Sequence, residues 1–469
     1  MPAIQSINPA TEELLGTFAE ATPEEVEAAL TQTDAAFRSW RFSSFAERSA
    51  AMQRGAAHLR AKRDRFAALM TAEMGKPILE AEAEVEKCAW ACDYFAEHAA
   101  ALLADEPIET SARWSYVAFE PLGAVLAIMP WNFPFWQVFR FAAPALMAGN
   151  AAILKHAPNV PQCELAIEEV FREAGFPPGI FRNLRLPIGL VPSVIEDGRV
   201  CAVTLTGSVG AGSQVAAVAG RAIKKSVMEL GGSDPFIVLP DADLELAAQS
   251  AARARNQNSG QSCIAAKRMI VVDEIAGAFE QRFVEAVSAL RMGDPMQRET
   301  NVGPLARRDL RDNLARQVER SVQQGARVVL GGQQPEGRGY YYTPTILDRV
   351  TPEMPAFREE TFGPLAAVIY AKDPEHAITL ANDSAYGLGA SLWTRDLDLA
   401  RRLAPKLEAG SVFVNGIVAS DPRLPFGGIK RSGYGRELST FGLREFVNIK
   451  TLVLNDASGT AVRVERGAA

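Results

Sequence analysis

The segment NSGQSC places a thiol, that of Cys263, at its end and beside a glycine-containing turn. A lone cysteine is more often an inert core residue, so its partners elsewhere in the chain decide how it is interpreted. Glu229 opens ELGG, a carboxylate followed by two glycines that allow the backbone to approach a bound group closely. Asn132 lies at the centre of the rigid, mostly apolar PWNFP, where a buried amide needs a partner or a transition state to stabilise.

These three residue types match the chemical needs of aldehyde oxidation. The thiolate of Cys263 would add to the aldehyde carbon, and the Asn132 amide with a backbone N–H would stabilise the resulting oxyanion. Collapse of this adduct would expel a hydride to a nicotinamide and leave a thioester. Glu229, with a raised pKa, would then activate the water that releases the acid. The set predicts NAD(P)-dependent oxidation of an aldehyde to a carboxylic acid.

Two further features favour a dinucleotide. The apolar run 200–205 leads into Gly207 and Ser208 and then into a helical pattern, so backbone N–H groups at the helix start could hold a pyrophosphate. This turn is not G-x-G-x-x-G, and an ordinary strand–turn–helix is the alternative interpretation. Lys155 ends a second apolar run, where a cation could reach a ribose or phosphate, or could simply be a solvated strand end.

Bulk properties exclude several function classes. A net charge of -7 and a pI near 5.5 argue against binding to nucleic acid or to an anionic membrane. The N-terminus lacks the basic and apolar regions of a signal peptide, and the five cysteines are an odd, scattered set, as expected of reduced thiols in a cytoplasmic protein. No cluster of His and Cys has the spacing of a metal site, so no metal is expected.

The elements that must position these residues alternate between helices and strands. Thr22, Pro23 and Glu25 form a capping-box start for a first helix, and further helices are expected over 45–70 and 77–104. Short apolar runs predict strands over 123–129, 151–155, 200–205, 235–239, 269–272, 366–370 and 411–414. Strands separated by helix-length segments indicate an α/β fold with parallel sheets, in two domains that meet near 230–260.

With these residues in place, the chain resembles the aldehyde dehydrogenase superfamily over essentially its whole length. The matching segments follow the order of the family: PWNFP (130–134), LKHAPN (154–159), TGS (206–208), ELGG (229–232), GQSC (260–263), EETFGP (359–364), NDSAYGL (382–388) and PFGGIKRSGYGRE (425–437). The resemblance implies that Cys263 is the nucleophile, Glu229 the general base and Asn132 the oxyanion donor. Because the CoA-acylating branch lacks this base, hydrolysis of the thioester is favoured over transfer to CoA.

The resemblance also implies how a cofactor is held. Lys155 and Glu360 correspond to contacts with ribose hydroxyls, Ser208 to the pyrophosphate contact, and Phe362 to the residue beside the nicotinamide ribose. Three further residues complete the expected cofactor set: Trp131, Gly207 and Leu230. Pro158 replaces the glutamate or serine by which relatives distinguish NAD from NADP, so either NAD or NADP is expected, with NAD slightly favoured.

Within the superfamily, the resemblance is strongest to bacterial succinate-semialdehyde dehydrogenases. It implies that Arg140 faces a distal substrate carboxylate and that Ser420 assists, with Phe133 and Phe426 lining the substrate site. An arginine in an apolar run needs an anion, and a structural ion pair with an acidic residue of the other domain is the alternative. Gln257 stands where relatives carry a second arginine, which leaves neighbouring ω-carboxy aldehydes open as substrates.

Three other interpretations of function remain. The chain could be a broad-specificity aliphatic or aromatic aldehyde dehydrogenase with a structural Arg140, or a cysteine-dependent esterase or thiol hydrolase. A non-catalytic descendant of the family should have lost Cys263 or Glu229, and both are present.

The expected architecture follows from the resemblance as well. It implies a Rossmann-type cofactor domain (1–111 and 125–230), an α/β catalytic domain (231–444) and a small β oligomerisation element (112–124 and 445–469). Edge strands in that element would be unpaired in a monomer, so a homodimer or homotetramer is expected. The polar tail after about 455 is expected to be mobile.

Overall fold

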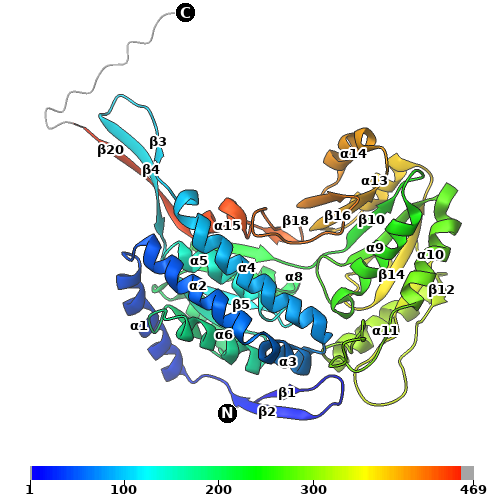
Figure 1. The fold of residues 1–469 in the computed structure, drawn as a ribbon, viewed down its shortest axis with the longest axis horizontal. Coiled ribbons are helices and arrows are strands. Elements are labelled where there is room, and N and C mark those ends of the chain that lie inside the picture. The colour runs from blue at the N-terminus through cyan, green and yellow to red at the C-terminus, as the bar shows by residue number, and fades with distance from the viewer. Residues whose placement is uncertain (1–2, 456–469) are drawn as a thin grey trace, which may run out of the picture.

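A computed structural model describes residues 3–455 of the chain as two α/β bodies and a projecting β arm (Figure 1). The expected mobile tail, and the end of the expected oligomerisation element, lie outside the described residues. The seven strands predicted from apolar runs all exist, and six of the runs are fully or largely buried, as in a parallel sheet covered on both faces. The seventh, 411–414, is the edge strand of its sheet and is only half-buried. The chain therefore has the α/β class that the sequence predicts.

The first body is built on a six-stranded sheet with the order β19-β9-β8-β5-β6-β7. Its strands are β5 (Ala124–Met129), β6 (Ala151–His156), β7 (Phe181–Asn183), β8 (Val200–Thr206), β9 (Lys225–Glu229) and β19 (Gly433–Tyr434). Five of them are parallel. From β5 the chain first adds β6 and β7 on one side and then adds β8 and β9 on the other, so the order of strand addition reverses between β5 and β8. Ligands of open α/β sheets bind at such a reversal, outside the carboxyl ends of the strands.

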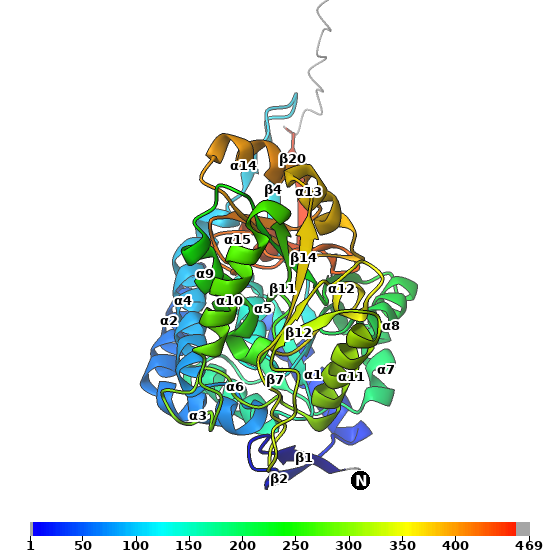
Figure 2. The ribbon, with the colours of Figure 1, turned by 90° about the vertical axis from the view of Figure 1, so that its right-hand side faces the viewer.

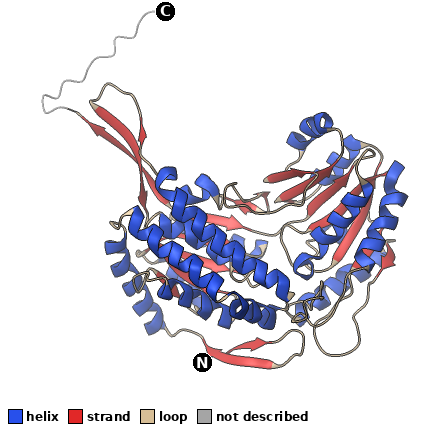
Figure 3. Ribbon diagram, in the orientation of Figure 1, coloured by secondary structure: helices blue, strands red, loops and turns tan. Residues whose placement is uncertain are grey.

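Helices cover this sheet on both faces (Figure 3). They are α1 (Pro23–Trp40), α2 (Phe45–Ala61), α3 (Arg63–Met74), α4 (Ile78–Leu102), α5 (Trp136–Met147), α6 (Pro161–Glu173), α7 (Val191–Glu196) and α8 (Val209–Arg221). The capping box predicted at Thr22 is present. The single helix expected over 45–70 is wrong, because the chain leaves helical geometry at Lys62 (φ -114°, ψ 16°) and a new helix begins.

The second body is built on a seven-stranded sheet with the order β12-β13-β14-β11-β10-β16-β17. Its strands are β10 (Asp234–Val238), β11 (Ala266–Val272), β12 (Arg327–Leu330), β13 (Thr345–Asp348), β14 (Leu365–Ala371), β16 (Gly389–Trp393) and β17 (Ser411–Val414). All pairs are parallel except β12 with β13. The strand β11 matters most for function, since the loop that carries Cys263 leads into it.

Helices lie on both faces of this sheet (Figure 2), and alternate residues of its strands belong to two separate hydrophobic clusters, one on each face. One cluster involves α9 (Leu244–Asn256) and α10 (Ala276–Ser288). The other involves α11 (Arg308–Gln323), α12 (Pro355–Arg358), α13 (Pro374–Asn382) and α14 (Leu397–Leu403). Ile237 faces the second cluster and Phe236 the first, as the period of two in a strand requires.

The arm consists of β3 (Glu106–Pro107), β4 (Trp114–Pro121) and β20 (Val447–Leu454), which project from the first body (Figure 1). β20 pairs with β4 along its whole length, and apolar side chains on both strands are exposed, among them Trp114, Ile449 and Val453. A hairpin of β1 (Ala3–Ile7) and β2 (Leu14–Ala19), which the sequence patterns did not predict, lies at the opposite end. Short β15 (Tyr386–Gly387) and β18 (Ile429–Lys430) pair with each other, and α15 (Ser439–Glu445) precedes β20.

Within residues 3–455, none of the helices has both the length and the apolar character that crossing a membrane requires. The same residues contain no group of three or more His, Cys, Asp or Glu side chains arranged to hold a metal ion.

Candidate active site

A cavity of about 500 Å³ lies between the two bodies, and eight of the predicted site residues line it, although Glu229 is not one of them. Cys263 comes to it from the second body and Asn132 from the first. The lining also contains six of the seven residues predicted to hold a cofactor: Trp131, Gly207, Ser208, Leu230, Glu360 and Phe362. The carboxyl ends of β5, β8 and β9 meet at this edge of the first sheet, so the loops that follow them reach one place.

Buried hydrogen bonds from two sides hold the PWNFP turn after β5. The Nδ1 of His156 accepts a hydrogen bond from the backbone N–H of Ala157 (2.8 Å), so its Nε2 donates to the Pro134 carbonyl (2.9 Å). Burial lowers the pKa of His156 to about 4, which keeps the ring in this neutral form. A carboxylate oxygen of Glu84 on α4 accepts the backbone N–H groups of Phe135 and Trp136 (2.9 Å each), at the start of α5.

Hydrogen bonds of Asn132 hold the loop that carries Cys263. The amide Nδ2 of Asn132 donates to the Gln261 carbonyl (3.0 Å), and the Asn258 amide donates to both the Asn132 carbonyl (2.7 Å) and the Gln261 carbonyl (3.0 Å). Asn258 and Ser259 have left-handed backbone, with φ of 56° and 54°. Non-glycine residues hold this conformation only where the surroundings impose it, and such strain is concentrated at functional sites.

The Cys263 thiol borders the cavity but is surrounded by protein atoms on its other sides. Burial raises its pKa to about 12, although the positive charges of Arg140 and Lys267 act in the opposite direction. The Lys267 ammonium donates to the carbonyls of Ser262 (2.9 Å) and Cys263 (2.8 Å). The thiol is therefore protonated at neutral pH in this structure, and the reaction has to include removal of its proton.

The two glycines of ELGG allow other parts of the protein, rather than a bound group, to approach the backbone closely. A Cβ on Gly231 would collide with the Glu360 carboxylate, and one on Gly232 would collide with the Cys263 carbonyl. The backbone N–H of Gly232 donates to that same Glu360 carboxylate (2.9 Å). These glycines let the nucleophile loop and Glu360 lie against the chain that carries Glu229.

Glu229 is the last residue of β9, with only 2% of its surface exposed. Burial raises its pKa well above the usual value, and the charge of Glu437 raises it further, while Arg140 and Arg436 oppose the shift. Among the described residues nothing donates a hydrogen bond to its Oε1. A buried carboxylate with a raised pKa and a free oxygen has the properties of a general base.

The residues predicted to hold a cofactor provide a suitable cradle. Ser208 caps the N-terminus of α8 through Ala211, and the Gly207 N–H donates to the Glu229 carbonyl (2.9 Å), so the turn is fixed beside the base. The ring of Phe362 meets Trp131 edge to face at 5.7 Å. Lys155 is the second-last residue of β6 and is not among the residues that line the cavity. Its ammonium donates to the His156 carbonyl (3.4 Å).

Arg140, predicted to face a substrate carboxylate, is paired within the protein. It lies on α5, fully buried, and its guanidinium forms an ion pair with Glu437, donates to the Thr206 hydroxyl (3.3 Å) and stacks over Phe426 (4.5 Å). This arrangement is that of the alternative interpretation, a structural ion pair with an acidic residue. Glu437 is the last residue of a quoted motif, but nothing in the sequence assigned it to Arg140.

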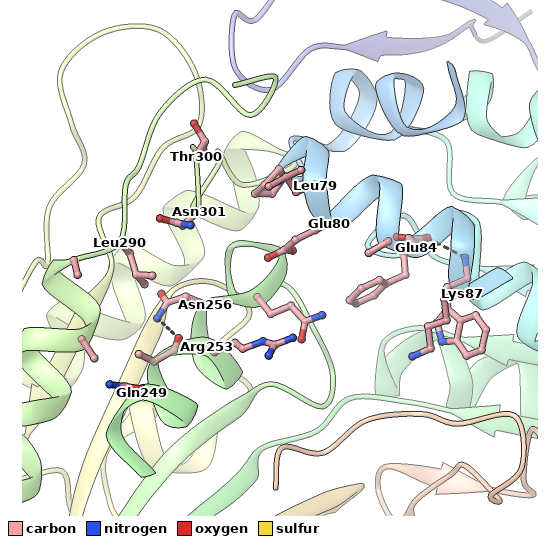
Figure 4. A pocket seen from close by; sticks show the side chains of 18 residues that line it. Leu79, Glu80, Glu84, Lys87, Gln249, Arg253, Asn256, Leu290, Thr300 and Asn301 are labelled. Atoms are coloured by element: carbon pink, nitrogen blue, oxygen red, sulfur yellow. Dashed lines mark hydrogen bonds between the residues drawn. The ribbon is translucent and has the colours of Figure 1, made fainter. Parts of the chain in front are cut away.

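The remaining predicted substrate residues line a second cavity or adjoin it. Phe133 and Trp136 line a cavity of about 710 Å³ between α4, α5 and α9 (Figure 4). The Ser420 hydroxyl accepts hydrogen bonds from the Trp136 indole (3.1 Å) and from Lys87 (2.8 Å). Lys87 was not predicted, because a single lysine on a helix is usually solvated.

Arg307 is a further residue that sequence reasoning missed. It lines the first cavity, and its guanidinium lies 5.8 Å from the Trp131 ring. An isolated arginine before a polar helix carries no signal in the sequence, so only its place beside Trp131 identifies it.

Comparison with known proteins agrees with this geometry. The model of the aldehyde dehydrogenase family matches residues 2–452. The chain belongs to the aldehyde dehydrogenase family. Among its family relatives, a succinate semialdehyde dehydrogenase [NAD(P)+] of Escherichia coli is 53% identical, over 95% of this chain and 97% of the relative. A probable succinate-semialdehyde dehydrogenase [NADP(+)] of Synechocystis is 52% identical, over 96% and 99%.

Solved structures of the aldehyde dehydrogenase family share the fold. A succinic semialdehyde dehydrogenase from Streptococcus pyogenes, solved with NADP+, is 38% identical with a TM-score of 0.95, covering 97% of this chain and 100% of that one. A structure described as giving insights into cofactor and substrate selection by Gox0499 is 42% identical, with the same TM-score and coverage. The predicted family and fold are confirmed.

We predict that replacing Asn132 by alanine lowers kcat by about 10²–10³-fold, which is the loss expected when the oxyanion donor that the resemblance implies is removed. Cofactor affinity, measured by quenching of tryptophan fluorescence, should change little. Asn258→Gly is the matched control, since it also loses a hydrogen bond to the Gln261 carbonyl, adopts the left-handed backbone freely and removes no group that lines the cavity. Equal losses of kcat in both variants would mean that Asn132 only braces the loop.

Proposed function

We propose that this chain oxidises an aldehyde to a carboxylic acid with NAD(P), and that the preferred substrate is succinate semialdehyde. The observation that carries the proposal is the convergence of Cys263, Asn132 and the six cofactor-type residues on one cavity. Glu229 does not line this cavity itself, but it directly precedes Leu230 and Gly231, which do. The strand reversal between β5 and β8, the start of α8 and the rings of Trp131 and Phe362 fit a dinucleotide there.

The proposed reaction begins when the Cys263 sulfur, after losing its proton, forms a bond to the aldehyde carbon. The carbonyl oxygen becomes an oxyanion, which the second N–H of the Asn132 amide is free to stabilise, since only one is used on the Gln261 carbonyl. The bound nicotinamide supplies the acceptor for the hydride that leaves this carbon. What remains on the enzyme is a thioester of Cys263.

Hydrolysis of the thioester falls to Glu229. The carboxylate takes a proton from water, the resulting hydroxide attacks the thioester carbon, and the C–S bond breaks to give the acid and the thiolate of Cys263. Burial raises the pKa of Glu229, so the carboxylate is a stronger base than an exposed one. Deacylation should therefore increase with pH as this carboxylate loses its proton.

Succinate semialdehyde is proposed because the relatives from Escherichia coli, Synechocystis and Streptococcus pyogenes carry that name. The carboxylate end of such a substrate needs a buried cation or hydroxyl, and Ser420 is available for it at the second cavity. For Arg140, a direct contact with the substrate carboxylate stays a prediction, since its charge is already balanced by Glu437.

We also propose that NADP is used at least as well as NAD. The slight preference for NAD expected from the sequence is not supported, because the names of these relatives specify NADP+ or NAD(P)+. Pro158 brings no carboxylate to the end of β6, so no negative charge at that position repels a 2′-phosphate.

An assay of three aldehydes with each cofactor tests this function. Succinate semialdehyde should give a kcat/KM about 10- to 100-fold above that of butanal or benzaldehyde, the range expected when a charge-assisted hydrogen bond is gained. Formation of reduced nicotinamide, followed by absorbance, gives the rates. Equal rates for all three aldehydes would replace the proposal with a broad-specificity enzyme, and ester cleavage without any cofactor reduction would replace it with an esterase.

Three other predictions from the sequence remain proposals: the domain division, self-association and the cellular setting. The division into a cofactor domain (1–111 and 125–230), a catalytic domain (231–444) and a small β element is one of them. Self-association through the arm is another, since the exposed apolar side chains of β4 and β20 would be covered by a second copy. A reducing, cytoplasmic setting is the third, because the reaction needs a free thiol at Cys263.

A further inference from the structure

The second cavity has a feature that the proposed chemistry does not yet use. Glu84 and Lys87 line it from α4, and Arg253 and Asn256 line it from α9 on the other side (Figure 4). It lies on the far side of the PWNFP turn from the nucleophile cavity. Trp131 and Asn132 of this turn line the nucleophile cavity, whereas Phe133 lines the second one.

The nucleophile loop also connects the two cavities. Gln257 lines the second cavity, and Cys263, at the other end of the same short loop, lines the first. A substrate whose aldehyde carbon lies at Cys263 can therefore extend past Phe133 toward the second cavity. The groups that line it there decide which substrate tail is accepted.

Lys87 and Ser420 present unused hydrogen-bond donors at this position. The Ser420 hydroxyl accepts from Lys87 (2.8 Å) and from the Trp136 indole (3.1 Å), which occupies both of its lone pairs. Its own O–H has no acceptor among the described residues. The Lys87 ammonium uses one N–H on Ser420 and lies 4.5 Å from the Trp136 ring, so it has further N–H groups to offer.

The charge of Lys87 is not balanced within the described part of the chain. No carboxylate there lies within ion-pair distance of its ammonium. The two nearby carboxylates have other partners: Glu84 is paired with Lys76, and Asp421 with Arg423 (2.6 Å). Arg140 differs in this respect, since Glu437 neutralises it.

We propose that Lys87, together with the Ser420 hydroxyl, binds the distal carboxylate of the substrate and determines the preference for acidic aldehydes. This inference rests on the proposed aldehyde oxidation and names the cation that gives it selectivity. Two donors of different kind lie 2.8 Å apart beside the Trp136 ring, and a carboxylate, with two acceptor oxygens, can accept a hydrogen bond from each. Lys87 lies on a different helix from Arg140, whose own contact with the substrate carboxylate stays a separate prediction.

The electrostatics of Lys87 give this role a pH dependence. Burial lowers the pKa of its ammonium to about 8, the like charge of Arg140 lowers it further, and Glu84, Asp421 and the neighbouring Cys88 oppose the shift. The cation is present below pH 8 and is lost as the pH rises above it. The selectivity for an acidic aldehyde over a neutral one should therefore fall above pH 8.

Lys87→Met tests the proposal, since it keeps the length of the side chain and removes the charge. Its kcat/KM for succinate semialdehyde should fall about 10- to 100-fold through KM, while that for butanal stays within about 3-fold of the parent value. Arg253→Met is the matched control, because Arg253 is an exposed cation lining the same cavity. It should leave the ratio of the two kcat/KM values unchanged.

Lys87→Arg separates charge from packing. Arginine stays charged at every accessible pH, so this variant should keep a preference for the acidic aldehyde and lose the decline above pH 8. Butanal oxidation by Lys87→Met shows that the variant is folded. If it does not fold, the parent enzyme decides the matter, because a kcat/KM ratio that is constant from about pH 7 to 9.5 overturns the role of a lysine of this pKa.

The outcomes distinguish this inference from the proposed function. A parent enzyme that oxidises both aldehydes equally would refute the preferred substrate and, with it, the role of Lys87. A parent that prefers succinate semialdehyde, with the same preference in Lys87→Met, would leave the function standing and overturn Lys87 alone. Loss of selectivity in Arg253→Met instead would place the carboxylate at the other side of the cavity.

Discussion

Replacing Glu229 by glutamine should give a single rapid release of reduced cofactor, equal to one per active site, followed by a steady rate about 10²–10⁴-fold below that of the parent. Glutamine has nearly the same shape and cannot take a proton from water, so the thioester forms and then persists. Stopped-flow absorbance measures the burst, and mass spectrometry of the quenched protein detects the acyl group on Cys263. Steady turnover at the parental rate would exclude Glu229 as the base.

Glu437→Gln is the matched control for this variant. Glu437 is buried like Glu229 and raises its pKa, but its carboxylate is engaged with Arg140. Loss of that charge should lower the pKa of Glu229, so the variant should keep multiple turnovers and shift the acidic limb of its pH–rate profile to lower pH. A burst without turnover in Glu437→Gln would mean that the wrong carboxylate has been assigned.

The second large effect is expected from Cys263→Ala, which should lower aldehyde oxidation by about 10⁴-fold or more, since no covalent adduct can form. Cofactor binding should persist, because the residues of the cradle are unchanged. Cys201→Ala is the control. This thiol is also partly exposed, but it lies against Gly123 at the starts of β8 and β5, and it does not line the cavity at their carboxyl ends. Its removal should leave kcat unchanged within about 2-fold.

The contradicting outcome for the cysteine is equally specific. If Cys263→Ala kept its oxidation rate, or if Cys201→Ala lost it, the covalent mechanism at Cys263 would be wrong. Alkylation by iodoacetamide adds a check on the parent. Because burial raises the pKa of the Cys263 thiol to about 12, the rate of alkylation in the absence of cofactor should rise steadily with pH through the neutral range.

The sequence predicted the central strands because each is an uninterrupted apolar run. β5, β6 and β8 are buried on both faces, so composition alone identifies them. The β1–β2 hairpin has no such signal, since most of its residues are exposed. The break at Lys62 has none either, because neither glycine nor proline marks it and no side-chain cap begins the second helix.

The site was predictable to the extent that motifs carry it. Cys263, Asn132 and the cofactor-type residues lie in short segments with unusual composition, and the fold brings these segments to one cavity. The partner of Arg140 could not be predicted, because Glu437 is far away along the chain and any acidic residue would have satisfied the expectation. The role proposed for Lys87 could not be predicted either, because it depends on contacts with Ser420 and Trp136, which are far from Lys87 in the sequence and close to it only in the fold.

The division of the site between the two bodies has a consequence for the making of the protein. Glu229 and Asn132 emerge from the ribosome before Cys263, and Glu437, which raises the pKa of Glu229, emerges 174 residues after Cys263. β19, made at that same late stage, completes the first sheet against β9. A chain made only as far as Cys263 therefore has all three reacting residues but lacks β19 and Glu437, so the sheet edge beside Glu229 and the pKa of that carboxylate take their final form only after the nucleophile has been made.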